Sequence, residues 1–357
     1  VDYDLNKGKL TAAAAAQRLE GLRFAWRGDP LEWEILRRLG LYYFQAKKYR
    51  DGFVNLERAR KLYPNQPGNA VLAQKLSDMF HDLFATEVGA AMTPLEALSL
   101  YQDYRYLVTD IAVARPIMRA LTERLVAIDL LEQAAQLLQD LLLGADGEEK
   151  GRLGARLAGI NLLDRQPAKA LTALDGSQGE SYPADLQQER LLLRARALIE
   201  QGQGDAAKAL LVAQNDVAGQ MLLADLAWRA GQWGEAAVAL RGALGAPPAE
   251  GALPSDKAQI AVRAATAYAL AADQNGLDNL SKEFGNAMLP TAQNALFTVL
   301  TEGQDTSSLR EMATKIGQSN DNDMFQRFLE RYRTPTLMTV PVEAKTSTER
   351  EPVKPAP

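Results

Sequence analysis

Residues 33–66 read WEILRRLGLYYFQAKKYRDGFVNLERARKLYPNQ, and this stretch decides the class of fold. Apolar residues recur at intervals of three and four both before and after Tyr49, which is the pattern of two amphipathic helices. The small residues Gly40 and Gly52 let such helices approach closely, and Pro64 ends the second one. The stretch therefore predicts one pair of packed helices.

A second stretch, residues 217–250, repeats this spacing of small, apolar and proline residues. Its matching positions are Leu223, Ala224, Ala227, Gly231, Trp233, Ala236, Leu240, Ala243 and Pro248. Three weaker copies lie between the two strong ones, unevenly spaced: Leu121, Leu125, Leu131, Ala134 and Leu138; Leu157, Ala158, Ala170 and Leu174; and Leu191, Ala195, Leu198, Gly202, Ala207 and Leu211. Internal repetition of helix pairs is typical of a solenoid.

The repeated unit resembles the tetratricopeptide repeat. Residues 33–66 have that repeat's standard length of 34 residues, with Leu39-Gly40 and Tyr43 at matching positions of the first helix. The recognisable copies cover roughly half of the chain. The resemblance implies a right-handed α-solenoid of about eight or nine helix pairs. The Ala-, Leu- and Gln-rich repeats with much arginine favour a bacterial protein.

The helical signal continues outside these copies up to residue 333, and no stretch of useful length alternates with the period of a strand. We expect an all-α protein of about eighteen helices. Its predicted parts are an N-terminal helix with the first repeat (1–66), irregular helices (67–114), repeats (115–250), degenerate helical repeats forming a C-terminal cap (251–333) and a tail (334–357).

The two ends of the chain carry separate expectations. Residues 334–357 hold five of the sixteen prolines and few large apolar residues, which predicts a disordered tail unless a partner or a neighbouring subunit holds it. The chain begins at Val1, and its first residues lack the polar character of a capping repeat. We therefore expect either the C-terminal part of a longer repeat protein or self-association through the N-terminal end.

Composition excludes several kinds of chemistry. The chain has no cysteine and a single histidine, His81, so it has no disulfide framework, zinc finger or cysteine nucleophile. Asp78 lies three residues before His81, but one histidine without further nitrogen or sulfur ligands makes a poor metal site. The carboxylates at Glu148-Glu149 and Asp321–Asp323 fit helix N-termini. We expect no enzyme activity, cofactor or metal.

Neither a membrane span nor a compartment can be assigned from the sequence. No run of eighteen apolar residues is present, so no transmembrane helix is expected. The absence of cysteine is compatible with both the bacterial periplasm and the cytoplasm.

The N-terminal third is basic and rich in aromatic residues, although the whole chain has a net charge of −5. Residues 18–61 hold eleven Lys or Arg against six Asp or Glu, and nine of the 24 aromatic residues lie between Phe24 and Tyr63. Such a surface could stack bases or bind an acidic protein. The alternative is a helical core with solvated arginines, and the overall charge argues against a general nucleic-acid binder.

The tetratricopeptide resemblance also implies which residues face a concave groove, since the first helix of each repeat lines it. Carried over by position, the groove would present Glu34, Arg37 and Phe44 from the first repeat, Glu189 and Arg196 from a middle copy, and Asp225, Trp228 and Arg229 from the last strong copy. Aromatic and arginine residues of this kind dominate many interfaces. The alternative is that these positions pack inside the molecule.

Two tryptophans of the last strong copy carry a sharper expectation. Trp228 lies where the family's first helix points away from the second helix, whereas Trp233 begins the second helix. The resemblance thus implies that Trp228 faces a partner and that Trp233 lies in the core.

The sequence as a whole predicts a non-catalytic scaffold that holds one or more proteins or peptide segments in a multiprotein assembly. Two alternatives stay open: binding of nucleic acid or another anionic polymer through the basic N-terminal third, and service as the recruitment or regulatory part of a longer enzyme.

Overall fold

The computed structural model describes residues 5, 7–22, 30–85, 87–89, 91–108, 110–214, 216–302, 311, 314, 329, 332 and 333. Within these residues every regular element is helical and no strand occurs, so the all-α prediction is confirmed. The α-helices are α2 (Ala12–Leu22), α3 (Pro30–Gln45), α4 (Tyr49–Leu62), α5 (Asn69–Ala85), α6 (Pro94–Tyr104), α7 (Ile111–Val126), α8 (Leu131–Leu143), α9 (Gly147–Leu163), α10 (Pro167–Gly176), α11 (Ala184–Glu200), α12 (Gly204–Leu211), α13 (Val217–Arg229), α14 (Trp233–Leu244), α15 (Ser255–Ala271), α16 (Gln274–Met288) and α17 (Asn294–Glu302). Two 3-10 turns, η1 (Glu87–Gly89) and η2 (Arg105–Leu107), flank α6.

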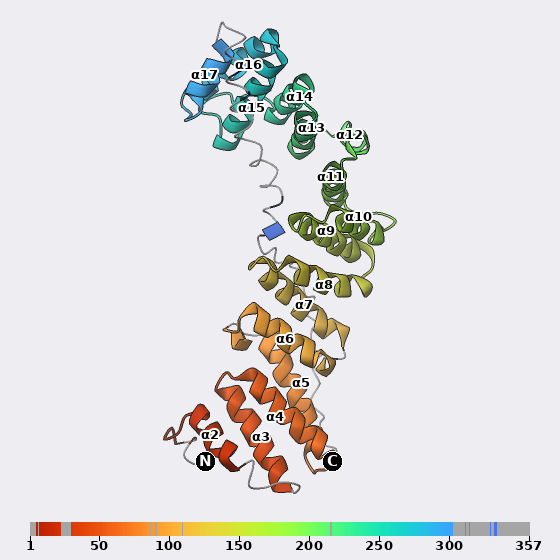
Figure 1. The fold of residues 1–357 in the computed structure, drawn as a ribbon, viewed down its shortest axis with the longest axis vertical. Helices are drawn as coiled ribbons and strands as arrows, with labels where there is room; N and C mark the ends of the chain where they lie inside the picture. Colours follow the sequence, from red (N-terminus) through yellow and green to blue (C-terminus); the bar gives the residue numbers. More distant parts are fainter. Residues whose placement is uncertain are drawn as a thin grey trace, which may run out of the picture.

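Neighbouring helices along the chain pack against one another and form an elongated stack, with α2 and α3 at one end and α16 and α17 at the other (Figure 1). Six pairs recur: α3/α4, α7/α8, α9/α10, α11/α12, α13/α14 and α15/α16. We call the first helix of each pair the A helix and the second the B helix. In the middle of the stack, A helices also contact the A helix of the next pair, α9 against α11 and α11 against α13.

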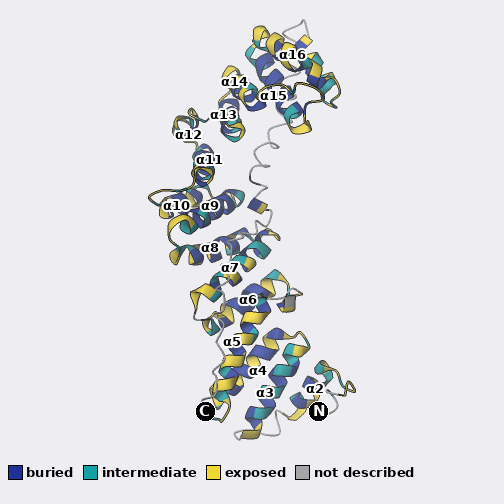
Figure 2. Cartoon of the chain, turned by 180° about the vertical axis from the view of Figure 1, so that it is seen from behind, coloured by how far each residue is buried: buried dark blue, intermediate teal, exposed yellow. Residues whose placement is uncertain are grey.

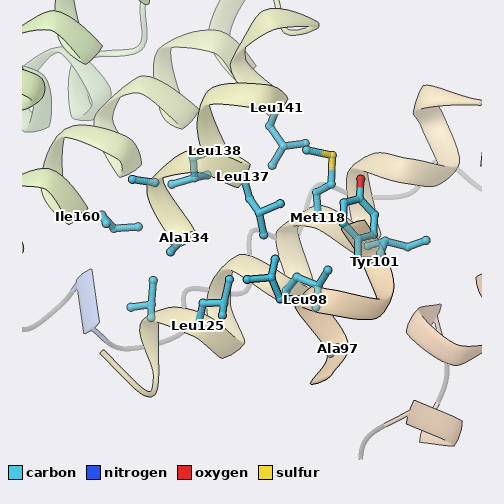
Figure 3. Close-up of a cluster of buried hydrophobic side chains, with 14 of the residues drawn as sticks. Ala97, Leu98, Tyr101, Met118, Leu125, Ala134, Leu137, Leu138, Leu141 and Ile160 are labelled. Atoms are coloured by element: carbon cyan, nitrogen blue, oxygen red, sulfur yellow. The ribbon is translucent and has the colours of Figure 1, made fainter. Parts of the chain in front are cut away.

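The core lies between the packed helices and follows the length of the stack, while exposed residues cover the outside (Figure 2). Around α6, α7, α8 and α9 it is built mainly from leucine, with alanines such as Ala97 and Ala134 among the buried residues (Figure 3). Tyr101, Leu125 and Leu138 are buried in this part of the core. Burial of one such leucine side chain contributes about 1.5–3 kcal/mol to the free energy of unfolding. Packing between neighbouring helices therefore stabilises helices that would be only marginally stable alone.

The helices of the first pair approach most closely at two glycines. A Cβ atom added to Gly40 on α3 would lie 2.5 Å from Leu56 Cγ and 2.9 Å from the carbonyl oxygen of Gly52 on α4. A Cβ added to Gly52 would lie 3.0 Å from the carbonyl oxygen of Gly40. The close approach predicted from these two small residues is confirmed.

The six A–B turns share one backbone geometry. In each turn one residue with positive φ stands two positions before the B helix: Lys47 (59°), Asp129 (62°), Arg165 (54°), Gly202 (75°), Gly231 (68°) and Ala272 (56°). The next residue donates its N–H to the carbonyl five residues earlier, for example Lys48 to Tyr43 and Gln203 to Leu198. This is the hydrogen bond of a Schellman motif, which ends a helix with a left-handed residue. The pairs are therefore repeats of one helical hairpin, although only two of the six turns use glycine.

The turn at Ala272 leads to a stability prediction. A left-handed residue with a Cβ atom is strained, and glycine is not, so Ala272→Gly should raise the free energy of unfolding by about 1 kcal/mol. The equivalent turn between α11 and α12 has Gly202, where an added Cβ would meet nothing within 4 Å. Gly202→Ala should therefore lower the free energy of unfolding by about 1 kcal/mol. Urea titrations followed by circular dichroism measure both; two changes of the same sign would contradict the shared geometry.

Candidate functional site

Ion pairs join successive A helices along one side of the stack. They are Arg115–Glu149, Arg119–Glu149 and Glu123–Arg156 between α7 and α9, Arg152–Asp185 between α9 and α11, and Arg196–Asp225 between α11 and α13. The two residues of each pair are 29 to 34 positions apart in the sequence, which is close to one repeat. We call the surface that carries these pairs the A-helix face.

Three of the predicted groove residues meet on this face, between α11 and α13. Arg196 Nε donates to Glu200 Oε1 at 2.6 Å, and Arg196 Nη1 donates to Asp225 Oδ2 at 3.0 Å. Arg229 Nε donates to the same Asp225 oxygen at 3.0 Å. Burial lowers the pKa of Arg196, while the two carboxylates act in the opposite direction. Arg229 is half exposed, whereas Arg196 is largely buried. Arg229 is therefore the cation that this ion-pair group presents at the surface.

Trp228 does not belong to an open groove, so the expectation that it faces a partner is wrong. The expectation for Trp233 holds in part, because its side chain packs against the core cluster that contains Trp228. Trp228 is 7% exposed, whereas Trp233 is only partly buried. The two rings meet edge-on, with centroids 5.2 Å apart, and the guanidinium of Arg263 on α15 lies 5.1 Å from the Trp228 centroid. The next A helix, α15, packs on α14, and its Arg263 covers the Trp228 ring at the position that the resemblance places toward a partner.

The predicted groove residues of α3 form a second group. Arg37 donates through Nε and Nη2 to the two oxygens of Glu34 at 2.8 and 2.7 Å, and Arg38 donates to Glu34 at 2.5 Å. The hydrogen bond to Glu34 raises the pKa of Arg37, whose guanidinium also lies 5.7 Å from the centroid of a Trp33 ring. This group is on the first pair, and α11 and α13 are well along the stack (Figure 1). The predicted residues therefore form two groups rather than one site.

Aromatic side chains of the N-terminal third pack inside the first helix pair. Phe44 meets Tyr49 and Phe53 edge-on, with ring centroids 5.0 and 5.9 Å away, and both of those partners are buried. Phe44 is thus part of the packing between α3 and α4, and its side chain is partly buried. Phe24 and Trp26 lie outside the described residues. The geometry of these rings favours internal packing over base stacking.

A segment from the C-terminal region lies on the A-helix face at the middle of the stack, drawn in blue beside α9 (Figure 1). Tyr332 is 3% exposed, and its ring lies against Gly159 of α9, where an added Cβ would overlap the ring. The guanidinium of Arg156 lies 5.8 Å from the ring centroid. The Tyr332 hydroxyl donates to Glu189 Oε1 of α11 at 2.6 Å. Glu189 is one of the positions that the repeat resemblance assigns to the groove.

The same segment makes two further contacts. Leu329 is buried in the core cluster that contains α7 to α11, and Arg333 pairs at 3.1 Å with Asp129, the left-handed residue of the α7–α8 turn. The sequence grouped residues 251–333 as a C-terminal cap, whereas Leu329, Tyr332 and Arg333 pack at the middle of the stack. The predicted disordered tail, 334–357, lies outside the described residues. We call the contact surface made by Asp129, Arg156, Gly159 and Glu189 the Tyr332 site.

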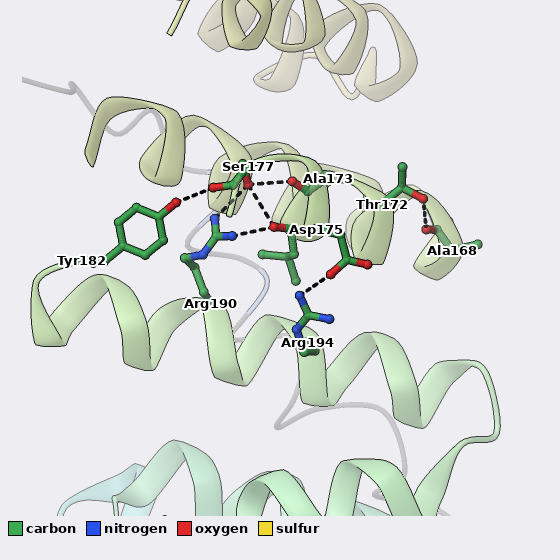
Figure 4. A network of polar contacts seen from close by, with 9 residues as sticks. Ala168, Thr172, Ala173, Asp175, Ser177, Tyr182, Arg190 and Arg194 are labelled. Carbon is green, nitrogen blue, oxygen red and sulfur yellow. Dashed lines mark hydrogen bonds and ion pairs between the residues drawn. The ribbon is translucent and has the colours of Figure 1, made fainter. Parts of the chain in front are cut away.

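A buried arginine holds α11 in place beside the Tyr332 site. Arg190 Nη1 donates to the Gly151 carbonyl and to Ser177 Oγ, both at 2.9 Å. Its Nη2 donates to the Leu174 carbonyl at 2.6 Å, so one guanidinium joins α9, α10 and α11. Figure 4 shows the contacts of Arg190 with the end of α10. Burial lowers the pKa of Arg190. Because Glu189 is the adjacent residue, this network also fixes the helical turn that carries the acceptor for Tyr332.

Arg156, Gly159 and Tyr332 were not predicted from the sequence. One signal was present: opposite charges recur on successive A helices at nearly the repeat length, as Glu123 and Arg156 do with 33 positions between them. That periodicity could have identified the A-helix face. No local pattern indicates the contact of Tyr332 with Glu189, because 143 positions separate the two residues.

The other chemical candidates have ordinary surroundings. His81 is half exposed, and its Nδ1 lies 3.4 Å from Asp82, while Asp78 accepts a hydrogen bond from Gln74. Over the described residues, no group of three or more His, Asp or Glu residues could hold a metal ion. No helix in the described part of the chain has both the length and the apolarity needed to cross a membrane.

No family model matches the chain, and no curated protein matches it either. The tetratricopeptide resemblance therefore stays a prediction that rests on the repeat residues.

Proposed function

We propose that this chain is a non-catalytic interaction scaffold, a right-handed tetratricopeptide-like α-solenoid whose A-helix face binds segments of partner proteins in a multiprotein assembly. One observation carries the proposal. The A-helix face binds a segment of this chain, burying Leu329 and Tyr332 and pairing Arg333 with Asp129. A face that binds one segment in this way has the mixture of apolar and charged groups that peptide recognition requires.

A second feature supports the same face. The Arg196–Asp225–Arg229 group offers an exposed cation held by a carboxylate that is itself fixed by a buried arginine. A partner carboxylate could bind Arg229 without reorganising α11 or α13, because Asp225 already fixes the guanidinium in direction. The exposed guanidinium of Arg229 thus suits a carboxylate of a partner segment.

The test is a selection of peptides from a phage-displayed random library on the immobilised full chain, followed by anisotropy titrations with labelled copies of the enriched peptides. Arg229→Glu should weaken binding by about tenfold, since it reverses an exposed charge on the A-helix face. The matched control is Lys208→Glu, which reverses a similarly exposed charge that pairs with Glu235 between the B helices α12 and α14. The control should leave binding unchanged.

Two results would contradict the proposal. One is a selection that enriches no peptide. The other is a set of peptides whose binding weakens as much with Lys208→Glu as with Arg229→Glu, since such peptides would not use the A-helix face.

A further inference from the structure

The Tyr332 site recognises three different chemical features of the segment that it holds. Gly159 provides a flat surface for the aromatic ring, because any side chain there would occupy the place of the ring. Glu189 accepts the hydrogen bond of the phenol, and Asp129 pairs with the cation that follows it. Each contact is with a different element of the stack: α9, α11 and the α7–α8 turn.

The charges of the site and of the segment that it holds are also complementary. The Tyr332 site contains two carboxylates, Glu189, which accepts the phenol hydrogen bond, and Asp129, which pairs with Arg333, while its arginine, Arg156, pairs with Glu123 at 2.7 Å. The segment from Leu329 to Arg333 reads LERYR, with two arginines and one glutamate. The basic residue Arg333 therefore meets an acidic residue of the site, and the ring of Tyr332 beside it is buried.

We propose that the Tyr332 site is a binding site for partner segments that carry an aliphatic residue, a tyrosine three positions later and then a basic residue, and that residues 329–333 are its internal competitor. This inference rests on the proposed function, because it names the class of segment that one part of the A-helix face takes. The internal segment closes the site until a partner segment of the same chemistry replaces it.

The effect of this competition on the affinity of a free peptide can be calculated. A ligand on the same chain acts at an effective concentration on the order of 1 mM. If the internal segment and a free peptide have the same intrinsic dissociation constant of about 10–100 μM, the internal segment weakens the free peptide roughly 10- to 100-fold. Removal of the tyrosine from the internal segment should restore that affinity.

The experiment uses a fluorescein-labelled peptide of residues 325–337, FQRFLERYRTPTL, titrated with the full chain and followed by anisotropy. The peptide should bind the Tyr332→Ala chain with a dissociation constant at least about tenfold lower than that of the unchanged chain. A peptide with alanine in place of its tyrosine should bind neither chain. Adding Gly159→Leu to the Tyr332→Ala chain should abolish binding, because leucine fills the position of the ring.

A second variant protects the test against a chain that fails to fold. Arg333→Ala leaves the buried ring in place and removes only the exposed pair with Asp129. It should open the site partly, with a peptide affinity between those of the unchanged chain and Tyr332→Ala. Circular dichroism on each variant confirms that the helices are intact.

Equal peptide affinity for the unchanged chain and for the opened variants would overturn the inference, as would binding that survives Gly159→Leu. A concentration-dependent dimer of the unchanged chain that is lost with Tyr332→Ala would also overturn it, because the segment would then bind between two copies. None of these results affects the Arg229→Glu test, so failure of this inference is distinguishable from failure of the proposed function.

Discussion

Replacing Trp228 with alanine is expected to lower the free energy of unfolding by about 3–5 kcal/mol, as truncation of a large buried aromatic residue does. The side chain is 7% exposed, and its ring packs between Trp233 and the guanidinium of Arg263. Alanine would leave a cavity at the junction of α13, α14 and α15 and would remove the aromatic partner of the arginine. Urea denaturation followed by circular dichroism measures the loss.

Trp233→Ala is the matched control, because the two tryptophans are the same residue type in one contact. Trp233 is only partly buried, so its truncation should cost about 1–2 kcal/mol. A larger loss for Trp233 than for Trp228 would contradict the packing of this pair and would return Trp228 to the groove position that the resemblance implied.

Gly40→Leu should lower the free energy of unfolding by about 3 kcal/mol, at the upper end of overpacking effects. Even the Cβ atom would lie 2.5 Å from Leu56 Cγ and 2.9 Å from the Gly52 carbonyl oxygen. A flexible side chain can move away from a new atom, but the Gly52 carbonyl is part of the α4 backbone. The helices α3 and α4 would have to separate along their contact.

Gly234→Leu controls for the effect of a leucine in place of a helical glycine. Gly234 is exposed near the start of α14, and an added Cβ there would meet nothing within 4 Å. Leucine is also the better helix former, so this variant should be neutral or more stable by up to about 1 kcal/mol. If both leucine variants prove neutral in urea denaturation, the close approach of α3 and α4 is wrong.

The fold class could be predicted from the sequence because it depends on local periodicity. The spacing of apolar residues on either side of Tyr49 predicts a helix pair, and Gly40 and Gly52 predict its close contact. The A–B turns at Lys47 and Ala272 could not be predicted. Their left-handed residues are selected by the backbone hydrogen bonds that end the A helix, and the usual signal, a glycine, is absent there.

The candidate site was less accessible to prediction because it depends on contacts between repeats. The resemblance placed Arg196, Asp225 and Arg229 together, and these three do meet in one ion-pair group. It failed for Trp228, since the exposure of that position depends on how α15 packs against α13 and α14. The contacts of Tyr332 could not be predicted, because its partners are far away in the sequence and belong to another part of the stack.

The shared turn has a consequence for how such a chain can change over evolutionary time. When a hairpin closes through main-chain atoms, lysine, aspartate, arginine, alanine and glycine can all occupy the same corner, as the six turns show. The residue at the left-handed position of an A–B turn can then be substituted while the helical hairpin keeps its fold. A corner of this kind is recognised by its backbone geometry rather than by its residue types. Comparison of corner geometry, hairpin by hairpin, should detect ancestry that residue patterns no longer carry.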